Sequence, residues 1–143
     1  MNRIYRYFSN KERGFTLVEL LIVVIILAVI TGIAIPSYLA LRNRARESAT
    51  ESEMRNIATA LELVNADTGN YPAAADMDAL ETALASYIDS IPTTDAWTHA
   101  YVYAQTGSGS GYTLTSAGID NGAAATGDDI VITNGEFTST GSY

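Results

Sequence analysis

The chain contains no cysteine, so no disulfide can close its loops, and another device would have to lock a small domain. Its single histidine, His99, excludes a metal site built on two histidines. The GxSxG turn of serine hydrolases and the GxxxxGK(S/T) loop that cradles phosphates are both absent. The serines and threonines have no evident activating base. The sequence therefore predicts a protein that is not an enzyme, with His99 in a structural role.

Positive charge is missing from most of the chain. No lysine or arginine follows Arg55, whereas eleven acidic residues do, and the net charge of the whole chain is -8. Nucleic-acid affinity depends largely on cationic contacts with phosphates. The sequence therefore predicts that nucleic acid is not a partner.

One long apolar run stands out in what remains. The 22 residues from Leu20 to Leu41 carry no charge, and at about 1.5 Å per residue a helix of that length spans roughly 33 Å, enough for a bilayer core of about 30 Å. Residues 1–14 hold four basic residues against one acidic residue, which favours a cytoplasmic N-terminal side, although three arginines follow the run closely. Glu19 lies at the margin of the run, where an ionised side chain needs a partner.

The residues before the run form a specific motif. They read Gly14-Phe15-Thr16-Leu17-Val18-Glu19. With the basic leader and Pro36, they resemble the prepilins of type IV pili and the pseudopilins of type II secretion. The resemblance implies that a prepilin peptidase cuts after Gly14, that Phe15 becomes an N-methylated N-terminus, and that Glu19 pairs with this amine in a neighbouring subunit. An ordinary secretory signal, by contrast, is cut after its apolar core.

Plainer interpretations stay open for two of these residues. Glu19 could reach the lipid headgroups from the end of a simple anchor helix, and Pro36 could be tolerated in a membrane helix without functional consequence. Because glycine and proline both weaken a helix, Gly32 and Pro36 predict a kink or local melting between them. The resemblance implies that this segment loses helicity when subunits assemble.

The helix is predicted to continue into water beyond the apolar run. Residues 15–41 would form the transmembrane and filament-core helix, and residues 42–143 a globular domain outside the membrane. Within an amphipathic helix over 42–66, apolar residues recur every three or four positions and should face the core. They are Met54, Ile57, Ala58, Leu61 and Val64. Gly69 suits a left-handed helix end, and a short helix is predicted over 76–90, before Pro92.

From Trp97 onward the pattern changes to the alternation that is typical of strands. Two strands are predicted around Tyr101–Tyr103 and Tyr112–Thr115, with a flexible glycine-serine connection between them. A third is predicted over Ile130–Thr133. The predicted fold class is α+β: the pilin fold, in which a long N-terminal helix packs against an antiparallel sheet of about three strands.

Three carboxylates lie between the second and third predicted strands: Asp120, Asp128 and Asp129. Calcium takes about six to eight oxygen ligands and mixes carboxylates with backbone carbonyls, so this loop could wrap an ion. A solvated acidic loop is the simpler interpretation of the composition alone.

This part of the chain also resembles the C-terminal part of the major pseudopilin of type II secretion. The shared features are Asp95-Ala96-Trp97, the Ser-Ala-Gly-Ile-Asp segment that ends at Asp120, and Gly127-Asp128-Asp129. The resemblance implies bound calcium, with Asp120, Asp128 and Asp129 as side-chain ligands and the backbone carbonyl of Leu114 as a further ligand. Calcium would then be the staple that cysteines cannot supply. The chain departs from the family around His99, where Asp-Pro-Trp-Gly-Asn-Pro-Tyr is usual.

The resemblance predicts a structural subunit of a type IV pilus-like filament, a homopolymer held together by its N-terminal helix. It favours a major pseudopilin of type II secretion, which works with an inner-membrane assembly platform and an outer-membrane secretin. One alternative is a type IV pilin that forms long surface fibres for adhesion or motility. Another is a membrane-tethered calcium-binding or adhesive module that does not polymerise. The precursor is expected in the inner membrane, and the filament in the periplasm or at the cell surface.

Overall fold

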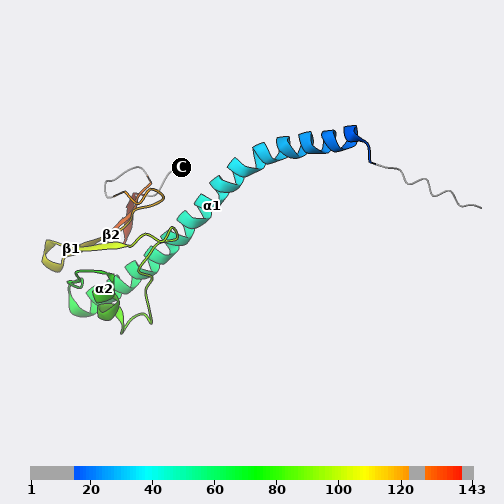
Figure 1. Cartoon of the computed structure of the whole chain (residues 1–143). Coiled ribbons are helices and arrows are strands. Elements are labelled where there is room, and N and C mark those ends of the chain that lie inside the picture. The colour runs from blue at the N-terminus through cyan, green and yellow to red at the C-terminus, as the bar shows by residue number, and fades with distance from the viewer. Residues whose placement is uncertain (1–14, 123–127, 140–143) are drawn as a thin grey trace, which may run out of the picture. The chain divides into compact units, whose positions relative to one another are not determined.

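The computed structural model describes residues 15–122 and 128–139 (Figure 1). The chain divides into two compact units, Met1–Tyr38 and Leu39–Tyr143. Gly14, after which the leader is predicted to be cut, lies outside the described residues. The fold is α+β, with a long N-terminal apolar helix and a small antiparallel sheet, which confirms the predicted pilin-like class.

Helix α1 runs from Leu17 to Thr68 and contains Pro36. It is helical on both sides of this proline, and two hydroxyls of the first unit bond back to carbonyls one turn earlier. Thr31 Oγ1 donates to Leu27 O at 2.7 Å, and Ser37 Oγ donates to Ile33 O at 3.1 Å. Such bonds supplement the backbone ladder of a helix near a proline. The predicted loss of helicity on assembly concerns the filament and stays a prediction.

The first unit is apolar on every side of α1. Its best window reaches a mean hydropathy of 3.0, and by length and composition α1 is the one helix in the described part of the chain that could cross a membrane. Its large side chains are exposed throughout, with exposed fractions from 44% at Val23 to 86% at Leu17. A helix that is hydrophobic all round has to be buried in lipid or among other helices. None of the described residues of this unit covers it.

The second half of α1 has a buried face that matches the predicted one. Met54, Ile57 and Leu61 are completely buried, and Ala58 and Val64 are nearly so. The helix ends as predicted, because Gly69 adopts a φ of +80° and donates its N–H to Asn65 O at 2.8 Å. This half of α1 is therefore the core helix of the second unit, as its spacing indicated.

Helix α2 is shorter than the predicted helix over 76–90. It runs only from Met77 to Leu84, and Asp76 caps it by accepting a hydrogen bond from Ala79 N at 2.8 Å. The prediction was wrong at the C-terminal end, where Tyr87 N and Ile88 N both bond to Leu84 O and the chain turns. Serine, tyrosine, isoleucine and aspartate in succession are weak helix formers, so tertiary contacts decide this segment.

Within the described residues the sheet has four strands rather than about three. They are β1 (Val102–Thr106), β2 (Gly111–Ser116), β3 (Ile130–Thr133) and β4 (Glu136–Ser139), and each pairs antiparallel with the next in the order β1-β2-β3-β4. The strand that was not predicted, β4, returns from β3 through Asn134 and Gly135, whose φ angles are +50° and +82°. Asn-Gly with two positive φ angles is the favoured two-residue hairpin turn.

The predicted flexible connection between β1 and β2 is instead a defined turn. Residues Gly107–Gly109 form the short helix η1. Gly109 is buried, its carbonyl accepts a hydrogen bond from Tyr71 N at 2.9 Å, and a Cβ at this position would lie 2.8 Å from Asn70 Oδ1. Glycine is needed here for close approach and a positive φ rather than for flexibility.

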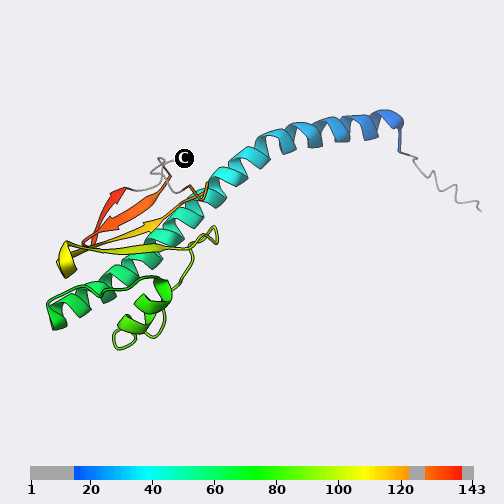
Figure 2. The same ribbon diagram turned by 60° about the vertical axis from the view of Figure 1, so that its left-hand side comes forward.

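The sheet and α2 pack with the second half of α1 around one core (Figure 2). The core takes Met77, Leu80 and Leu84 from α2 and, from the sheet, Tyr103, Tyr112, Leu114, Ile130 and Ile132. Three tyrosines also donate their hydroxyls to carboxylates of α1. These are Tyr101 to Glu53 at 2.8 Å, Tyr71 to Glu62 at 2.8 Å, and Tyr87 to Asp67 at 2.6 Å. Hydrogen bonds to ionised acceptors are short and strong, so these three Tyr–carboxylate ties fasten the domain to its helix.

We expect alkaline pH to unfold this domain through its buried tyrosines. Burial raises the pKa of Tyr103 to about 12, and burial also raises the pKa of Tyr101 and Tyr112. Unfolded tyrosine ionises near pH 10. The unfolded chain therefore loses these protons first, and the free energy of unfolding should fall from about pH 10 upward. Denaturant titrations in a pH series, with tyrosinate absorbance, test this; native tyrosines that ionise as readily as unfolded ones would contradict it.

Candidate functional site

Two of the predicted assembly residues lie at the N-terminal end of α1: Glu19 in its first turn, and Phe15 two residues before its first residue, Leu17. Thr16 precedes the helix, and its Oγ1 accepts a hydrogen bond from Glu19 N at 3.2 Å. In return, Glu19 Oε2 accepts from Thr16 N at 2.9 Å and from Thr16 Oγ1 at 3.0 Å. This reciprocal pattern is a capping box, which satisfies backbone N–H groups that the first helical turn leaves open.

Thr16 was not predicted as a site residue, although its Thr-x-x-Glu spacing before an apolar run is the signal of a capping box. In the single chain, Glu19 thus has a partner within its own first turn. Phe15, which directly precedes Thr16 in the sequence, is 78% exposed. Pro36 lies more than four turns further along α1, away from this end. The pairing of Glu19 with the amine of another subunit requires a second chain and stays a prediction.

The other candidate site is the acidic loop, residues 116–130, between β2 and β3. Residues 123–127 of this loop lie outside the described part of the chain. Ser116 ends β2 and pairs with Ile130, which begins β3. This pairing brings the two ends of the loop together, so that one carboxylate oxygen each of Asp120, Asp128 and Asp129 lies within 4.8 Å of the others. The three carboxylates predicted as ligands therefore converge.

Backbone groups hold this cluster in place. Asp128 Oδ2 accepts hydrogen bonds from Ile119 N at 3.2 Å and from Asp120 N at 3.3 Å. Gly118 has a φ of +62°, and a Cβ there would collide with the backbone oxygen of Asp128. Only glycine at position 118 lets the two described segments of the loop approach so closely.

The electrostatics of the cluster favour a cation. Burial raises the pKa of Asp129, and the nearby charges of Asp128 and Asp120 raise it further. Asp129 is only 5% exposed. Three carboxylates crowded in this way repel one another, and a divalent cation removes that repulsion. The donors are oxygens alone, the set that calcium prefers, so the described residues fit a calcium ion.

Leu114, the predicted backbone ligand, lies within β2, before the acidic loop begins. It is completely buried in the middle of β2, where it pairs with Tyr103 of β1 and Ile132 of β3. Carbonyls of an inner strand are used by the ladder on one side or the other. The residues after Ser116 lead directly into the carboxylate cluster. The role of the Leu114 carbonyl as a calcium ligand stays a prediction.

Asp95 is a site residue whose role was not predicted from the sequence. Its side chain is fully buried, and its Oδ1 accepts hydrogen bonds from Trp97 N and His99 N, both at 2.9 Å. Its Oδ2 accepts from Ser116 Oγ at 2.6 Å. His99 Nδ1 lies 2.8 Å from Gly118 O, so the predicted structural histidine touches the acidic loop. An aspartate that bonds to N–H groups just after it is a common turn signal, but its bond to Ser116 crosses 21 residues.

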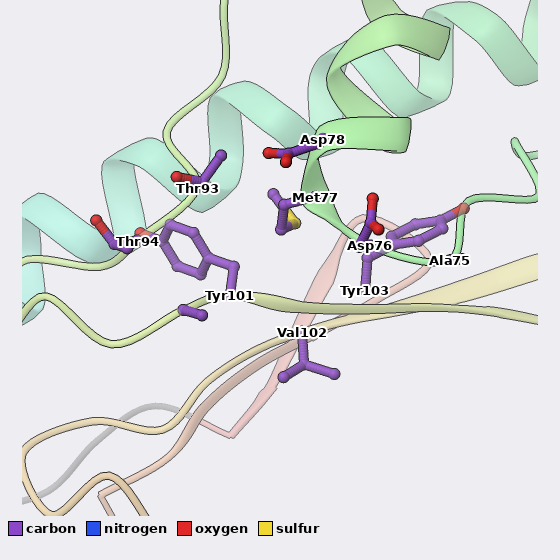
Figure 3. A pocket seen from close by; sticks show the side chains of 10 residues that line it. Ala75, Asp76, Met77, Asp78, Thr93, Thr94, Tyr101, Val102 and Tyr103 are labelled. Atoms are coloured by element: carbon purple, nitrogen blue, oxygen red, sulfur yellow. The ribbon is translucent and has the colours of Figure 1, made fainter.

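A groove of about 390 Å³ lies between the start of α2, Thr93 and Thr94, and β1 (Figure 3). Asp76 and Asp78 border it on the α2 side, and Tyr101 and Tyr103 border it on the β1 side. None of the predicted site residues lines this groove, and Asp76 is already used as the cap of α2.

Comparisons with known proteins agree with these features. Residues 37–135 match the family model "Type II secretion system (T2SS), protein G", and residues 9–35 match the "Prokaryotic N-terminal methylation motif". The chain is 31% identical over 134 residues to the type II secretion system core protein G of Escherichia coli, which covers 85% of this chain and 91% of that protein.

Two further relatives show the breadth of the similarity. The core protein G of Pseudomonas aeruginosa is 25% identical, over 87% of this chain and 96% of that protein. The type IV major pilin protein PilA of Myxococcus xanthus is 38% identical over 53 residues, which cover 37% of this chain and 24% of that protein. No solved structure matches. With the protein G model extending over most of its length, this chain belongs to the protein G family of type II secretion systems.

Proposed function

We propose that this chain is the repeating subunit of a type II secretion pseudopilus. The observation that carries this proposal is the protein G family match over residues 37–135, together with an N-terminal helix whose apolar side chains are not covered by any described residue of their own unit. A subunit of a polymer needs such a surface, since its partners are other copies of itself.

In this proposal the precursor is held in the inner membrane by the first half of α1. A prepilin peptidase cuts after Gly14, and Phe15 becomes the N-methylated N-terminus, in line with the methylation motif over residues 9–35. An inner-membrane assembly platform then adds subunits to the fibre, which acts beneath an outer-membrane secretin. The chain works as a structural element and catalyses no reaction.

Burial of α1 drives the assembly. A segment of 22 uncharged residues cannot face water once it leaves the bilayer, and each Å² of apolar surface removed from water contributes about 25 cal/mol. Apolar packing alone does not select one alignment of two such helices. A charge pair between Glu19 of one subunit and the Phe15 amine of the next sets the register, the role in which buried ion pairs are best attested.

The same subunit is proposed to carry one calcium ion in the acidic loop. Asp120, Asp128 and Asp129 supply carboxylate oxygens, and their convergence within 4.8 Å supports this assignment. Backbone carbonyls complete the ligand set, and the residues after Ser116, where the β2–β3 ladder ends, lead directly to the carboxylates. The ion would offset the repulsion of the carboxylates and close the loop that no disulfide closes.

The intact mass of the protein in fractions of the cells that make it tests the proposal. A mass of residues 15–143 plus one methyl group, found in the membrane fraction and not among sheared surface fibres, is expected for a pseudopilin. The same processed mass in abundant sheared fibres would favour the second candidate, a type IV pilin, which the match to the Myxococcus xanthus pilin supports. An unprocessed mass would contradict both and favour a tethered module that does not polymerise.

A further inference from the structure

A tight turn connects α1 with the acidic loop. Residues 94–100, here called the Asp95 turn, are closed by a bridge between Thr94 and Ala100, and Asp95 N donates to His99 O at 2.8 Å. Thr98 in this turn has a φ of +74°, which is uncommon for a residue with a branched side chain. The surrounding bonds hold the turn in this conformation, because Thr98 N donates to Asp95 O at 2.9 Å.

One side of the Asp95 turn is fastened to α1. Ala96 N donates to Thr50 Oγ1 at 3.2 Å, and Thr50 is completely buried on the helix. The two residues are 46 positions apart in sequence. A buried hydroxyl needs a partner, so this bond fixes the turn at one point along α1.

The other side of the Asp95 turn holds the beginning of the acidic loop. Ser116 Oγ donates to Asp95 Oδ2 at 2.6 Å and accepts from Gly118 N at 3.3 Å. His99 Nδ1 must carry the hydrogen in its 2.8 Å contact with Gly118 O, since a carbonyl can only accept. Both backbone groups of Gly118 are therefore held, its N–H by Ser116 and its carbonyl by His99.

The position of Gly118 determines where the next two residues lie. It packs against the backbone of Asp128, and the next two N–H groups, those of Ile119 and Asp120, both donate to Asp128 Oδ2. A displacement of Gly118 would break these bonds or press it into Asp128. The position of the three carboxylates thus depends on the position of Gly118, and this depends on Asp95 and His99.

We propose that Asp95 and His99 are positioning residues for the calcium ion of the acidic loop, and that the Asp95 turn couples the ion to α1 at Thr50. This inference rests on the proposed calcium site. Mutation of a group that orients a metal ligand without touching the ion typically weakens metal affinity by about 10- to 100-fold. Asp95 accepts hydrogen bonds from two segments, its own turn and Ser116 at the end of β2. A buried carboxylate without such partners would be costly, so these bonds indicate that Asp95 holds the two segments together.

The test is calcium affinity, measured by isothermal titration calorimetry on the full chain in detergent. His99→Leu removes the donor to Gly118 and is expected to weaken calcium binding by about 10-fold or more. His99→Asn keeps a donor at nearly the place of Nδ1 and is expected to restore an affinity close to that of the wild type. Ser116→Ala, which removes one oxygen, gives a second measurement and is expected to weaken binding like His99→Leu.

Tyr87→Phe is the matched control for a general loss of stability. It removes the hydroxyl bond to Asp67, which involves no residue of the Asp95 turn, so calcium affinity should not change. Amide hydrogen exchange gives the second readout. Calcium should slow exchange of the Ala96 N–H in the wild type and fail to do so in Ser116→Ala.

Each outcome decides the inference. Wild-type calcium affinity in both His99→Leu and Ser116→Ala would overturn the positioning role while leaving the calcium site standing. An unchanged exchange rate at Ala96 on adding calcium would overturn the coupling to α1. A wild-type chain that binds no calcium would overturn the calcium site itself, and the inference with it, but not the proposal that the chain forms a filament.

Discussion

Glu19→Ala is expected to abolish fibre assembly while leaving the precursor inserted in the membrane. Removal of one partner from a buried ion pair costs about 3 to 5 kcal/mol, which corresponds to roughly 150- to 5,000-fold in the equilibrium constant for adding each subunit. Membrane insertion depends on the apolar run and should persist in this variant. The substitution removes a carboxylate, and an ionised carboxylate opposes burial in lipid. Fractionation of cells into membranes and sheared or crosslinked fibres measures both properties, and normal fibres from this variant would rule out the pairing.

Two further variants separate the ion pair from the capping box. Glu19 also caps α1 through Thr16, and loss of a cap costs only about 0.5 to 2 kcal/mol. Thr16→Val removes the hydroxyl but leaves the carboxylate, so it should reduce assembly without abolishing it. Glu51→Ala makes the same change as Glu19→Ala on the part of α1 that belongs to the second unit and serves as the matched control. Equal defects in Thr16→Val and Glu19→Ala would assign the effect to the cap.

Removal of calcium is expected to destabilise the globular domain strongly. A ligand present at about 100 times its Kd stabilises the folded state by about 2.7 kcal/mol. For a domain of about 100 residues, this corresponds to a fall in Tm of roughly 10 °C or more on chelation. Asp120→Asn should lower Tm in calcium and make it insensitive to chelator, whereas Asp89→Asn, the same change in the segment between α2 and the Asp95 turn, should do neither. An unchanged Tm after chelation would exclude a structural ion.

The effect of chelation should also depend on pH in a defined direction. In the metal-free domain, burial and the neighbouring carboxylates raise the pKa of Asp129 above its ordinary value of 3.8. Protonated Asp129 therefore stabilises the metal-free fold. This stabilisation is complete below the ordinary pKa and is lost as the pH rises through the higher pKa of the folded state. Protons also compete with calcium for the carboxylates. The difference in Tm between calcium and chelator should be largest near neutral pH and shrink in acid.

Local periodicity was sufficient to predict the buried face of the second half of α1. Met54, Ile57 and Leu61 repeat at three- and four-residue steps, and a helix buries one such face whatever lies opposite it. The glycine at position 69 ends the helix by a conformation that glycine adopts without strain. The acidic loop was predicted from composition and resemblance, and its three carboxylates do converge.

Features that depend on distant partners were beyond such patterns. Strand β4 has only Phe137 as an apolar residue, so it forms because the Asn134-Gly135 turn returns the chain along β3. The same turn is held by Tyr112, whose N–H donates to Asn134 Oδ1 at 2.8 Å. Asp95 finds its partner 21 residues later in Ser116. No spacing within a short window indicates that a buried aspartate will be satisfied in this way.

The three Tyr–carboxylate ties also have a mechanical consequence. Their acceptors run from Glu53 to Asp67, a distance of 14 residues, or roughly 21 Å along α1 at about 1.5 Å per residue. In the proposed filament, a force along the fibre axis would act on these bonds side by side rather than one after another. The three bonds would then share the load in shear, and a domain held at three separated points would resist being pulled away from its helix.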